Sequence, residues 1–417
     1  MVAVDQAEPE QSAKRLLVLG AGPAQLGLLA AARKRDLYVI AVDRDPSAPG
    51  FRHADRRAIV STEDEPAIER LAVAERVDGV IAPGIDWPVA IAARLAARLG
   101  LPHPISPETA VLSTSKLRQR ERFAEAGVPQ PTYEVCSGAK EAARAAETIG
   151  YPCVVKAPDR QGQRGLTLVP SGRRMESAVE TALDASRSAT LLVEEHVSGR
   201  ELTVNGFSLA GRFRPLTVTD RLTADPPAFG VALAHVWPSE LQHGQIAAAI
   251  DAASAAAGAL GIENGPSYTQ VLVGAEGPRV GEVAARLGGG HDAELCRAVL
   301  GINLNALALS GALGEEIEPQ RLAPRVGAGG GCIRFLVASP GELRAVRGVE
   351  EAFELAGVRG IRLYRRPGHR FGPLLRGSDR AGAVLAVGAN RAEALGRAER
   401  AAKLIRFETA PSEALVG

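Results

Sequence analysis

Two of the chain's lysines stand beside segments suited to holding phosphate. Only six of the 49 Lys and Arg residues are lysines; Lys116 opens a predicted helix and Lys156 ends a predicted buried strand. The loop after that strand, APDRQGQRG, carries Gln161, Gly162 and Gly165. An ammonium is a compact charge, and glycines let a loop turn its N–H groups toward an anion. The pattern predicts a polyphosphate site, although a glycine loop alone is also typical of a solvated hairpin.

A hinge follows the next apolar strand, in LLVEEHVSGRELTVNGF. The strand runs into Glu194 and Glu195, and a turn at Ser198 and Gly199 leads to Glu201. Backbone groups at such a hinge can pair with an adenine edge, and a carboxylate can accept hydrogen bonds from ribose hydroxyls. The alternative is that these acids form a solvated strand end.

A predicted β-hairpin carries oxygen ligands and is followed by a guanidinium group. Its turn at Gly274 to Gly277 is expected to set Gln270 against Glu282, and both side chains offer oxygen to a hard cation such as Mg²⁺. Arg286 comes four residues after Glu282 and could hold an acyl phosphate or a carboxylate. A structural hairpin with a surface Glu and Arg is the alternative.

The surrounding elements predict an α/β and α+β chain of several domains. Apolar strands alternating with Ala-rich helices over residues 14–112 predict a doubly wound parallel sheet. We expect one linker helix from Ser113 and a lid lobe within 113–193, a nucleotide- and metal-binding lobe over 194–330 and a C-terminal lobe over 331–410. The first dozen residues are expected to be a loose tail.

Composition favours a small-molecule partner. The formal net charge of +1 provides no basic field for nucleic acid or an anionic membrane. Four widely spaced cysteines without a CxxC pair suggest neither zinc nor a disulfide framework, so reduced thiols in the cytoplasm are expected. Neither a signal peptide nor a membrane span is expected.

The order of these elements resembles the ATP-grasp superfamily over residues 14–409. The resemblance implies an ATP-grasp fold with a Rossmann-like N-terminal domain, a central lid lobe and a C-terminal lobe, and it implies ATP and Mg²⁺ as cofactors. The roles it implies are phosphate binding by Lys116 and Lys156 under the loop 159–165, adenine contact by the backbone of Glu195 and Val197, ribose binding by Glu201, and metal binding by Gln270 and Glu282.

Within that superfamily, the final lobe (CIRFLVASPGELRAVRGVE) looks like the C-terminal domain of biotin carboxylases and of amino-acid ligases of the bacilysin-synthetase type. The phrase EVAARLGGGH is similar to those ligases, and Arg286 matches their catalytic arginine. Many relatives carry Glu at the position of Gln270 and Asn at that of Ala284, so weaker metal binding is expected here.

The resemblance implies an ADP-forming ligase that activates a carboxylic or amino acid as an acyl phosphate and joins it to an amine, as an amide or dipeptide in specialised biosynthesis. The candidate substrate residues are Asp220, Arg221, His235, Ser239, Arg286, Gly288 and Gly289. A histidine in an apolar strand is also typical of a structural residue. Two alternatives stay open, a bicarbonate-activating carboxylase or carbamoyl-type enzyme and a noncatalytic nucleotide-binding protein. A homodimer is expected from the resemblance alone.

Overall fold

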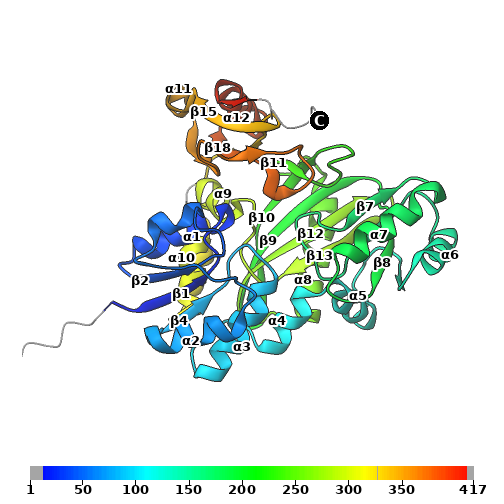
Figure 1. The fold of residues 1–417 in the computed structure, drawn as a ribbon, viewed down its shortest axis with the longest axis horizontal. Coiled ribbons are helices and arrows are strands. Elements are labelled where there is room, and N and C mark those ends of the chain that lie inside the picture. The colour runs from blue at the N-terminus through cyan, green and yellow to red at the C-terminus, as the bar shows by residue number, and fades with distance from the viewer. Residues whose placement is uncertain (1–12, 326, 411–417) are drawn as a thin grey trace, which may run out of the picture.

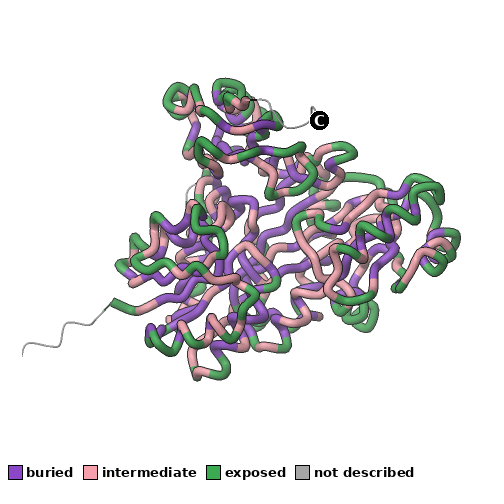
Figure 2. Tube along the Cα trace, viewed as in Figure 1, coloured by how far each residue is buried: buried purple, intermediate pink, exposed green. Residues whose placement is uncertain are grey.

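A computed structural model describes residues 13–325 and 327–410 of the chain. The expected N-terminal tail lies outside these residues. Figure 1 shows the N-terminal parallel sheet on the left, a long sheet through the centre, the lid lobe on the right and a C-terminal lobe at the top. Figure 2 shows that buried residues follow the strands of each part, while the outer helices carry most of the exposed ones.

The N-terminal sheet is parallel throughout, with the strand order β3-β2-β1-β4. Its strands are buried because their apolar runs are covered by helices; residues 16–19 of β1 are fully buried. This confirms the expected doubly wound pattern. The elements are β1 (Arg15–Leu19), α1 (Leu26–Arg33), β2 (Tyr38–Val42), β3 (Arg56–Ala58), α2 (Glu65–Glu75), β4 (Gly79–Ile81) and α3 (Trp87–Leu99).

The linker helix expected from Ser113 is α5 (Lys116–Glu125), and the Ser/Thr cluster supplies its cap as predicted. A separate helix that the sequence did not predict, α4 (Pro107–Thr114), ends just before it. The break is at Ser115, whose backbone is extended and whose hydroxyl caps α5 by accepting the N–H of Arg118 at 3.4 Å. Ser115 therefore ends one helix and starts the next, which places Lys116 in the first turn of α5.

The lid lobe is a four-stranded antiparallel sheet with two helices, in the strand order β5-β8-β6-β7. Its core is made of apolar residues, most of them alanine and valine, from both helices and the strands. The glycine loop joins β6 to β7, as the sequence predicts. The elements are β5 (Tyr133–Cys136), α6 (Ala139–Ile149), β6 (Cys153–Lys156), β7 (Leu166–Val169), α7 (Met175–Ala185) and β8 (Leu191–Glu195).

The central sheet has eight strands in the order β13-β12-β9-β10-β11-β14-β18-β16. It continues across the boundary expected at residues 330 and 331, because β14 pairs with β11 along four residues. Helix α8 packs on β10, β12 and β13. The elements are β9 (Arg200–Leu209), β10 (Arg212–Thr223), β11 (Ala232–Trp237), α8 (His243–Ala259), β12 (Gly265–Gly274), β13 (Gly277–Ala284), α9 (Asp292–Leu300), α10 (Leu304–Ala312), β14 (Gly330–Leu336), β16 (Val358–Leu363) and β18 (Gly382–Gly388).

The C-terminal lobe adds a small antiparallel sheet, β17-β15-β19, and two helices at the top of Figure 1. Helix α12 lies against β14 and β18 and so attaches this lobe to the central sheet. The elements are β15 (Gly341–Arg347), α11 (Val349–Glu354), β17 (Arg370–Phe371), α12 (Arg391–Leu404) and β19 (Arg406–Ala410).

The four cysteines are buried and free. No single helix of the described residues is long and apolar enough to cross a membrane; α9 and α10 pass that test only as a pair bent by 120°.

Candidate functional site

A cavity of about 350 Å³ lies between the lid lobe and the central sheet. Ten of the residues that the sequence singles out for nucleotide and metal binding line it: Lys116, Lys156, Gln161, Gly162, Glu194, Glu195, Val197, Glu201, Gln270 and Glu282. They come from α5, β6, the glycine loop, the β8–β9 hinge and the β12–β13 hairpin.

Gly165 does not line this cavity. It is buried with φ +65°, and a Cβ at this position would lie 2.6 Å from the Cβ of Ala185. Its role in the structure is the close approach of the loop end to α7. The assignment of Gly165 to nucleotide contact is therefore corrected.

Lys156 is held in a buried ionic cluster at the floor of the cavity. Its Nζ lies 2.7 Å from Glu194 Oε2, and Arg120 Nε donates to Glu194 Oε1 at 2.8 Å. Burial lowers the pKa of Lys156 to about 8, despite the opposing effect of Glu194. Burial would raise the pKa of Glu194, but Arg120 and Lys156 outweigh it and hold that pKa at about 2. Two cations around one carboxylate leave net positive charge facing the cavity.

Lys116 bridges the glycine loop and the hairpin. Its Nζ donates to the carbonyl oxygen of Arg160 at 2.6 Å and lies 3.1 Å from Glu282 Oε2. Burial would raise the pKa of Glu282, but Lys116 and Arg286 outweigh it and the pKa is lowered. Glu282 is therefore an ionised carboxylate beside a lysine, between the loop and the sheet.

Gln270 and Glu282 are direct cross-strand partners in the β12–β13 hairpin, as the sequence predicts. Gln270 Nε2 donates to Glu201 Oε1, and Arg221 forms an ion pair with the same oxygen. The amide nitrogen of Gln270 is thus engaged, which leaves its Oε1 as the atom that could bind a cation. Burial raises the pKa of Glu201 more than Arg221 lowers it.

A second cavity, of about 320 Å³, adjoins the first and is bounded by the turn at residues 22–25, which follows β1, and by the C-terminal lobe. Arg286 lines it and is fixed by Asp86, whose Oδ1 accepts from Arg286 Nε at 2.6 Å. Burial raises the pKa of Asp86, and Arg286 opposes that rise. Arg221, His235 and Gly289 also line this cavity.

His235 is oriented by a carboxylate. Its Nδ1 lies 3.0 Å from Asp292 Oδ1, and Phe335 stacks edge-on against the ring. Burial would raise the pKa of Asp292, but His235 outweighs it and holds that pKa at about 2. An ionised Asp292 accepts a hydrogen bond from Nδ1–H and so fixes the orientation of the imidazole.

Three of the sequence-based substrate candidates lie outside this cavity. The Ser239 hydroxyl donates to Asp220 Oδ1 at 2.6 Å, and Arg391 lies 2.7 Å from Asp220 Oδ2, so these side chains tie β10 to α12. Gly288 packs against Asp292 and Tyr268 instead. Asp220, Ser239 and Gly288 are therefore corrected to structural positions.

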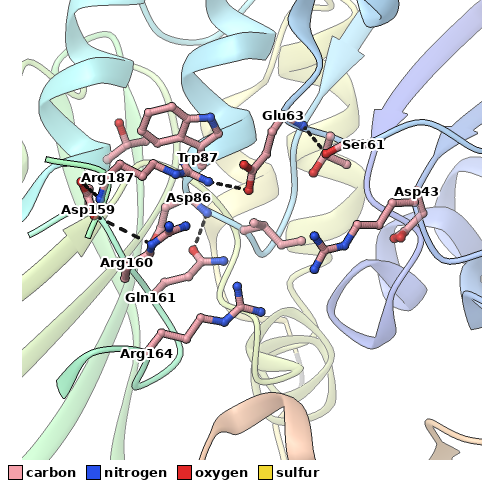
Figure 3. A pocket seen from close by; sticks show the side chains of 14 residues that line it. Asp43, Ser61, Glu63, Asp86, Trp87, Asp159, Arg160, Gln161, Arg164 and Arg187 are labelled. Carbon is pink, nitrogen blue, oxygen red and sulfur yellow. Dashed lines mark hydrogen bonds and ion pairs between the residues drawn. The ribbon is translucent and has the colours of Figure 1, made fainter. Parts of the chain in front are cut away.

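The lid lobe contacts the N-terminal part of the chain around a third cavity, of about 170 Å³ (Figure 3). Arg187 lies over the Trp87 ring, 3.7 Å from its centroid, and pairs with Glu63 at 2.5 Å. Gln161 Oε1 accepts the backbone N–H of Asp86 at 2.6 Å. The glycine loop is thus connected to the residue that holds Arg286.

The sequence reading missed Asp86 and Arg120. Asp86 sits in the loop before α3, and nothing local marks it as a partner of a residue in another lobe. A signal existed for Arg120, because it follows Lys116 by four residues and so shares its helix face. Its place in the charged run KLRQRER concealed a side chain that is fully buried.

Two family models match parts of the chain. Residues 334–410 match the L-amino acid ligase C-terminal domain 2, and residues 115–204 match the ATP-binding domain of the carbamoyl-phosphate synthase L chain. An uncharacterized protein of Sinorhizobium fredii is 28% identical over 91% of this chain and 80% of its own length. A formate-dependent phosphoribosylglycinamide formyltransferase of Synechococcus is 26% identical over 94% of this chain and 97% of its own.

Solved structures show the same fold at low identity. The L-amino acid ligase of Bacillus licheniformis superposes with a TM-score of 0.82 at 20% identity, over 95% of this chain and 99% of that one. The biotin carboxylase domain dimer of the Hydrogenobacter thermophilus 2-oxoglutarate carboxylase, in complex with MgADP, ADP and bicarbonate, superposes with a TM-score of 0.79 at 18% identity, over 96% and 92%.

Proposed function

We propose that the chain is an ATP-grasp ligase that activates a carboxylic acid with ATP as an acyl phosphate and joins that acid to an amine; the two family models that match residues 115–204 and 334–410 support this proposal. ADP and inorganic phosphate are the other products. The enzyme would serve specialised amide or dipeptide synthesis. A cytoplasmic location and a homodimeric state stay predictions.

The observation that carries this proposal is the junction of the two larger cavities. Both are lined by Gln270 and Glu282, by Arg221 and by the glycine-loop residues 161–164. A nucleotide in the first cavity, with its adenine at the β8–β9 hinge, would place its terminal phosphate at this junction. An acid in the second cavity would then approach that phosphate beside Arg286.

The first step forms a bond between a carboxylate oxygen and the γ-phosphorus and breaks the bond from that phosphorus to the bridging oxygen, so ADP leaves. Lys116 and Lys156 neutralise the phosphates, and the loop over residues 157–165 excludes water. In the second step the amine nitrogen attacks the carbonyl carbon, phosphate leaves with the electron pair of the C–O bond, and the nitrogen loses a proton. Arg286 stabilises the charge that develops on the transferred group.

Magnesium fits the residues present. Mg²⁺ is usually held by one or two protein oxygens together with substrate phosphates and water, and Glu282 with Gln270 Oε1 supplies such a pair. The described residues contain no group of three His, Cys, Asp or Glu side chains that could hold a metal ion by themselves. The bound metal would supply neutralisation of phosphate charge.

His235 is the group proposed to take the proton from the amine. It lines the second cavity, and Asp292 holds its Nδ1. The remaining nitrogen, Nε2, is suited to accept a proton, and ionised Asp292 stabilises the imidazolium that results.

The test is ADP release by the purified protein with ATP and Mg²⁺ across pools of carboxylic acids and amines, with product mass read in parallel. The proposal expects ADP release that requires both an acid and an amine, and a product lighter than their sum by one water. ADP release with bicarbonate and no amine would instead identify the bicarbonate-activating alternative, for which the likeness to the biotin carboxylase domain is the supporting observation.

A further inference from the structure

The cavity beyond Arg286 is lined by five guanidinium groups and one carboxylate. The carboxylate is Glu282, which is already paired with Lys116. The guanidinium groups belong to Arg164, Arg221, Arg286, Arg365 and Arg380. Because its positive side chains outnumber its negative one, the cavity attracts anions, and it offers no unpaired carboxylate to bind an ammonium group.

Two of the five arginines are neutralised within the protein. Arg221 pairs with Glu201, and Arg286 pairs with Asp86. Arg164, Arg365 and Arg380 have no carboxylate at ion-pair distance within the described part of the chain, and the guanidinium groups of Arg365 and Arg380 donate to carbonyl oxygens only.

Arg380 is held in a fixed orientation. Its guanidinium lies over the Phe335 ring, 3.7 Å from the centroid, and its Nε donates to the carbonyl oxygen of Gly377 at 2.7 Å. Burial lowers the pKa of Arg380, and the positive charge of Arg221 adds to that effect. A largely desolvated cation without an anion is unfavourable, so a bound anion would stabilise it.

Arg365 is fixed by the same loop. Its Nη1 donates to the Tyr364 carbonyl oxygen at 3.2 Å and its Nη2 to the Ser378 carbonyl oxygen at 3.4 Å. The Tyr364 hydroxyl lies 2.6 Å from His291 Nε2, which anchors the chain just before Arg365. Asp379 accepts the N–H groups of Leu375 and Arg376 and closes the loop over 375–379. Hydrogen bonds to this loop therefore hold the two arginines in fixed positions at the end of the cavity.

We propose that one of the two substrates carries a second anionic group, a carboxylate or a phosphate, and that Arg365 and Arg380 bind it. This inference rests on the proposed ligase function and names its substrate class: an acid or an amine with an additional negative charge, as in a dicarboxylic acid, an acidic amino acid or a phosphorylated amine. Guanidinium groups suit both kinds of anion because their paired N–H donors match two oxygens.

The test compares matched substrates in the ADP-release assay. Succinate is paired with butyrate as the acid, and aspartate and O-phosphoserine are paired with alanine as the amine. We expect kcat/KM for an anionic member to exceed that of its neutral partner by at least about 30-fold. The aspartate and O-phosphoserine arms separate a carboxylate site from a phosphate site. Equal turnover of neutral and anionic members would overturn the inference while leaving the ligase function standing.

Variants locate the site. Arg380→Gln and Arg365→Gln are expected to raise the KM of the anionic substrate by about 30-fold or more and to leave ATP binding unchanged, whereas Arg380→Lys keeps part of the affinity. Arg366→Gln is the matched control, because Arg366 adjoins Arg365 but is exposed and does not line the cavity. Unchanged KM in both Gln variants contradicts the inference.

A binding measurement decides the case in which no pair releases ADP. Succinate, aspartate and O-phosphoserine are titrated by calorimetry into protein saturated with a nonhydrolysable ATP analogue. Binding that Arg380→Gln abolishes would support the anion site even though the ligase function had failed. No binding of any of the three would overturn the inference.

Discussion

Arg286 is held by Asp86, a residue 200 positions earlier in the chain, through a buried hydrogen bond of 2.6 Å between Nε and Oδ1. The backbone N–H of Asp86 is in turn bonded to Gln161 of the glycine loop. Three parts of the chain thus meet at one arginine: the N-terminal domain supplies its partner Asp86, the lid contacts that partner, and the segment after β13 carries the arginine itself. Arg286 is fixed only when these parts are together.

Asp86→Asn should lower kcat by about 100-fold while changing the KM for ATP little, because Arg286 loses the charge that orients it and the nucleotide cleft is untouched. Steady-state ADP release measures both constants. Glu69→Gln is the control, since Glu69 pairs with Arg98 at the surface, where such pairs contribute at most about 1 kcal/mol. A kcat in Asp86→Asn equal to that of the control would show that Arg286 does not depend on Asp86.

ATP affinity should fall as the pH rises through about 8, because burial lowers the pKa of Lys156 to about 8 from its ordinary value of 10.5. The lysine is then charged below pH 8 and neutral above it, and only the charged form attracts phosphate. Bound phosphate favours the charged form and shifts the transition upward. Titration of ATP from neutral pH to well above pH 8 measures the effect.

Lys156→Arg is the matched variant for this pH dependence. Arginine keeps its charge through this range, so any remaining ATP binding should not show the decline. If ATP affinity declined equally with pH in the two proteins, a titrating group other than Lys156 would be responsible.

Glu194→Gln should destabilise the protein by about 3–5 kcal/mol at neutral pH, because Arg120 and Lys156 would share a buried site without a counter-charge. The pKa of Glu194 is about 2 in the folded protein, below its ordinary value of 4.5. The stability that ionised Glu194 contributes to the folded protein is therefore fully present above pH 4.5 and is lost as the pH falls through 2. Denaturant unfolding should show the two proteins converging in acid; a constant difference in stability down to pH 2 would contradict this assignment.

Arg187→Ala should loosen the lid, since it removes both the stacking on Trp87 and the ion pair with Glu63. Trypsin should cut after Arg160 and Arg164 faster in this variant, and bound ATP should slow the cleavage in wild type and variant alike. Arg173→Ala, an exposed lid arginine, serves as the control. Equal cleavage of the Arg187→Ala and control proteins would mean that this contact does not hold the lid.

Gln270→Glu should lower the melting temperature without Mg²⁺ and make it more dependent on Mg²⁺ and ATP. The new carboxylate would face Glu201, to which Gln270 now donates, so two acids would repel until a cation binds. Thermal unfolding with and without Mg²⁺ and ATP tests this expectation. A melting temperature that Mg²⁺ and ATP raise no more than in wild type would argue against a metal at this position.

Local patterns predicted the residues whose partners lie within one element or one hairpin. A short turn fixes the register of two strands, so the pairing of Gln270 with Glu282 followed from the sequence. Lys116 and Lys156 were identified because each lies at the end of an element that the local sequence predicts, a helix start and a strand end. Such signals are local, and they survive folding because no other lobe is needed to interpret them.

The remaining site residues depend on contacts between lobes. Asp86 and Arg380 reach the site only because distant lobes meet there, and no spacing in the sequence records that. Asp220 and Arg221 were both candidates, yet neighbouring residues of a strand face opposite sides of the sheet, so only one of them could line the cavity. Arg221 pairs across strands with His235 and shares its face, whereas Asp220 pairs with Val236. The alternation of side chains between the two faces could have been predicted from the sequence once β10 was identified as a strand.

The most direct measurement follows oxygen from the acid into phosphate. Acids labelled with oxygen-18 in the carboxylate are incubated with amines, ATP and Mg²⁺, and the inorganic phosphate is analysed by mass. An acyl phosphate intermediate requires that one labelled oxygen appear in each phosphate released together with ADP and the amide product. Phosphate without label, or the release of AMP and pyrophosphate, would contradict the account.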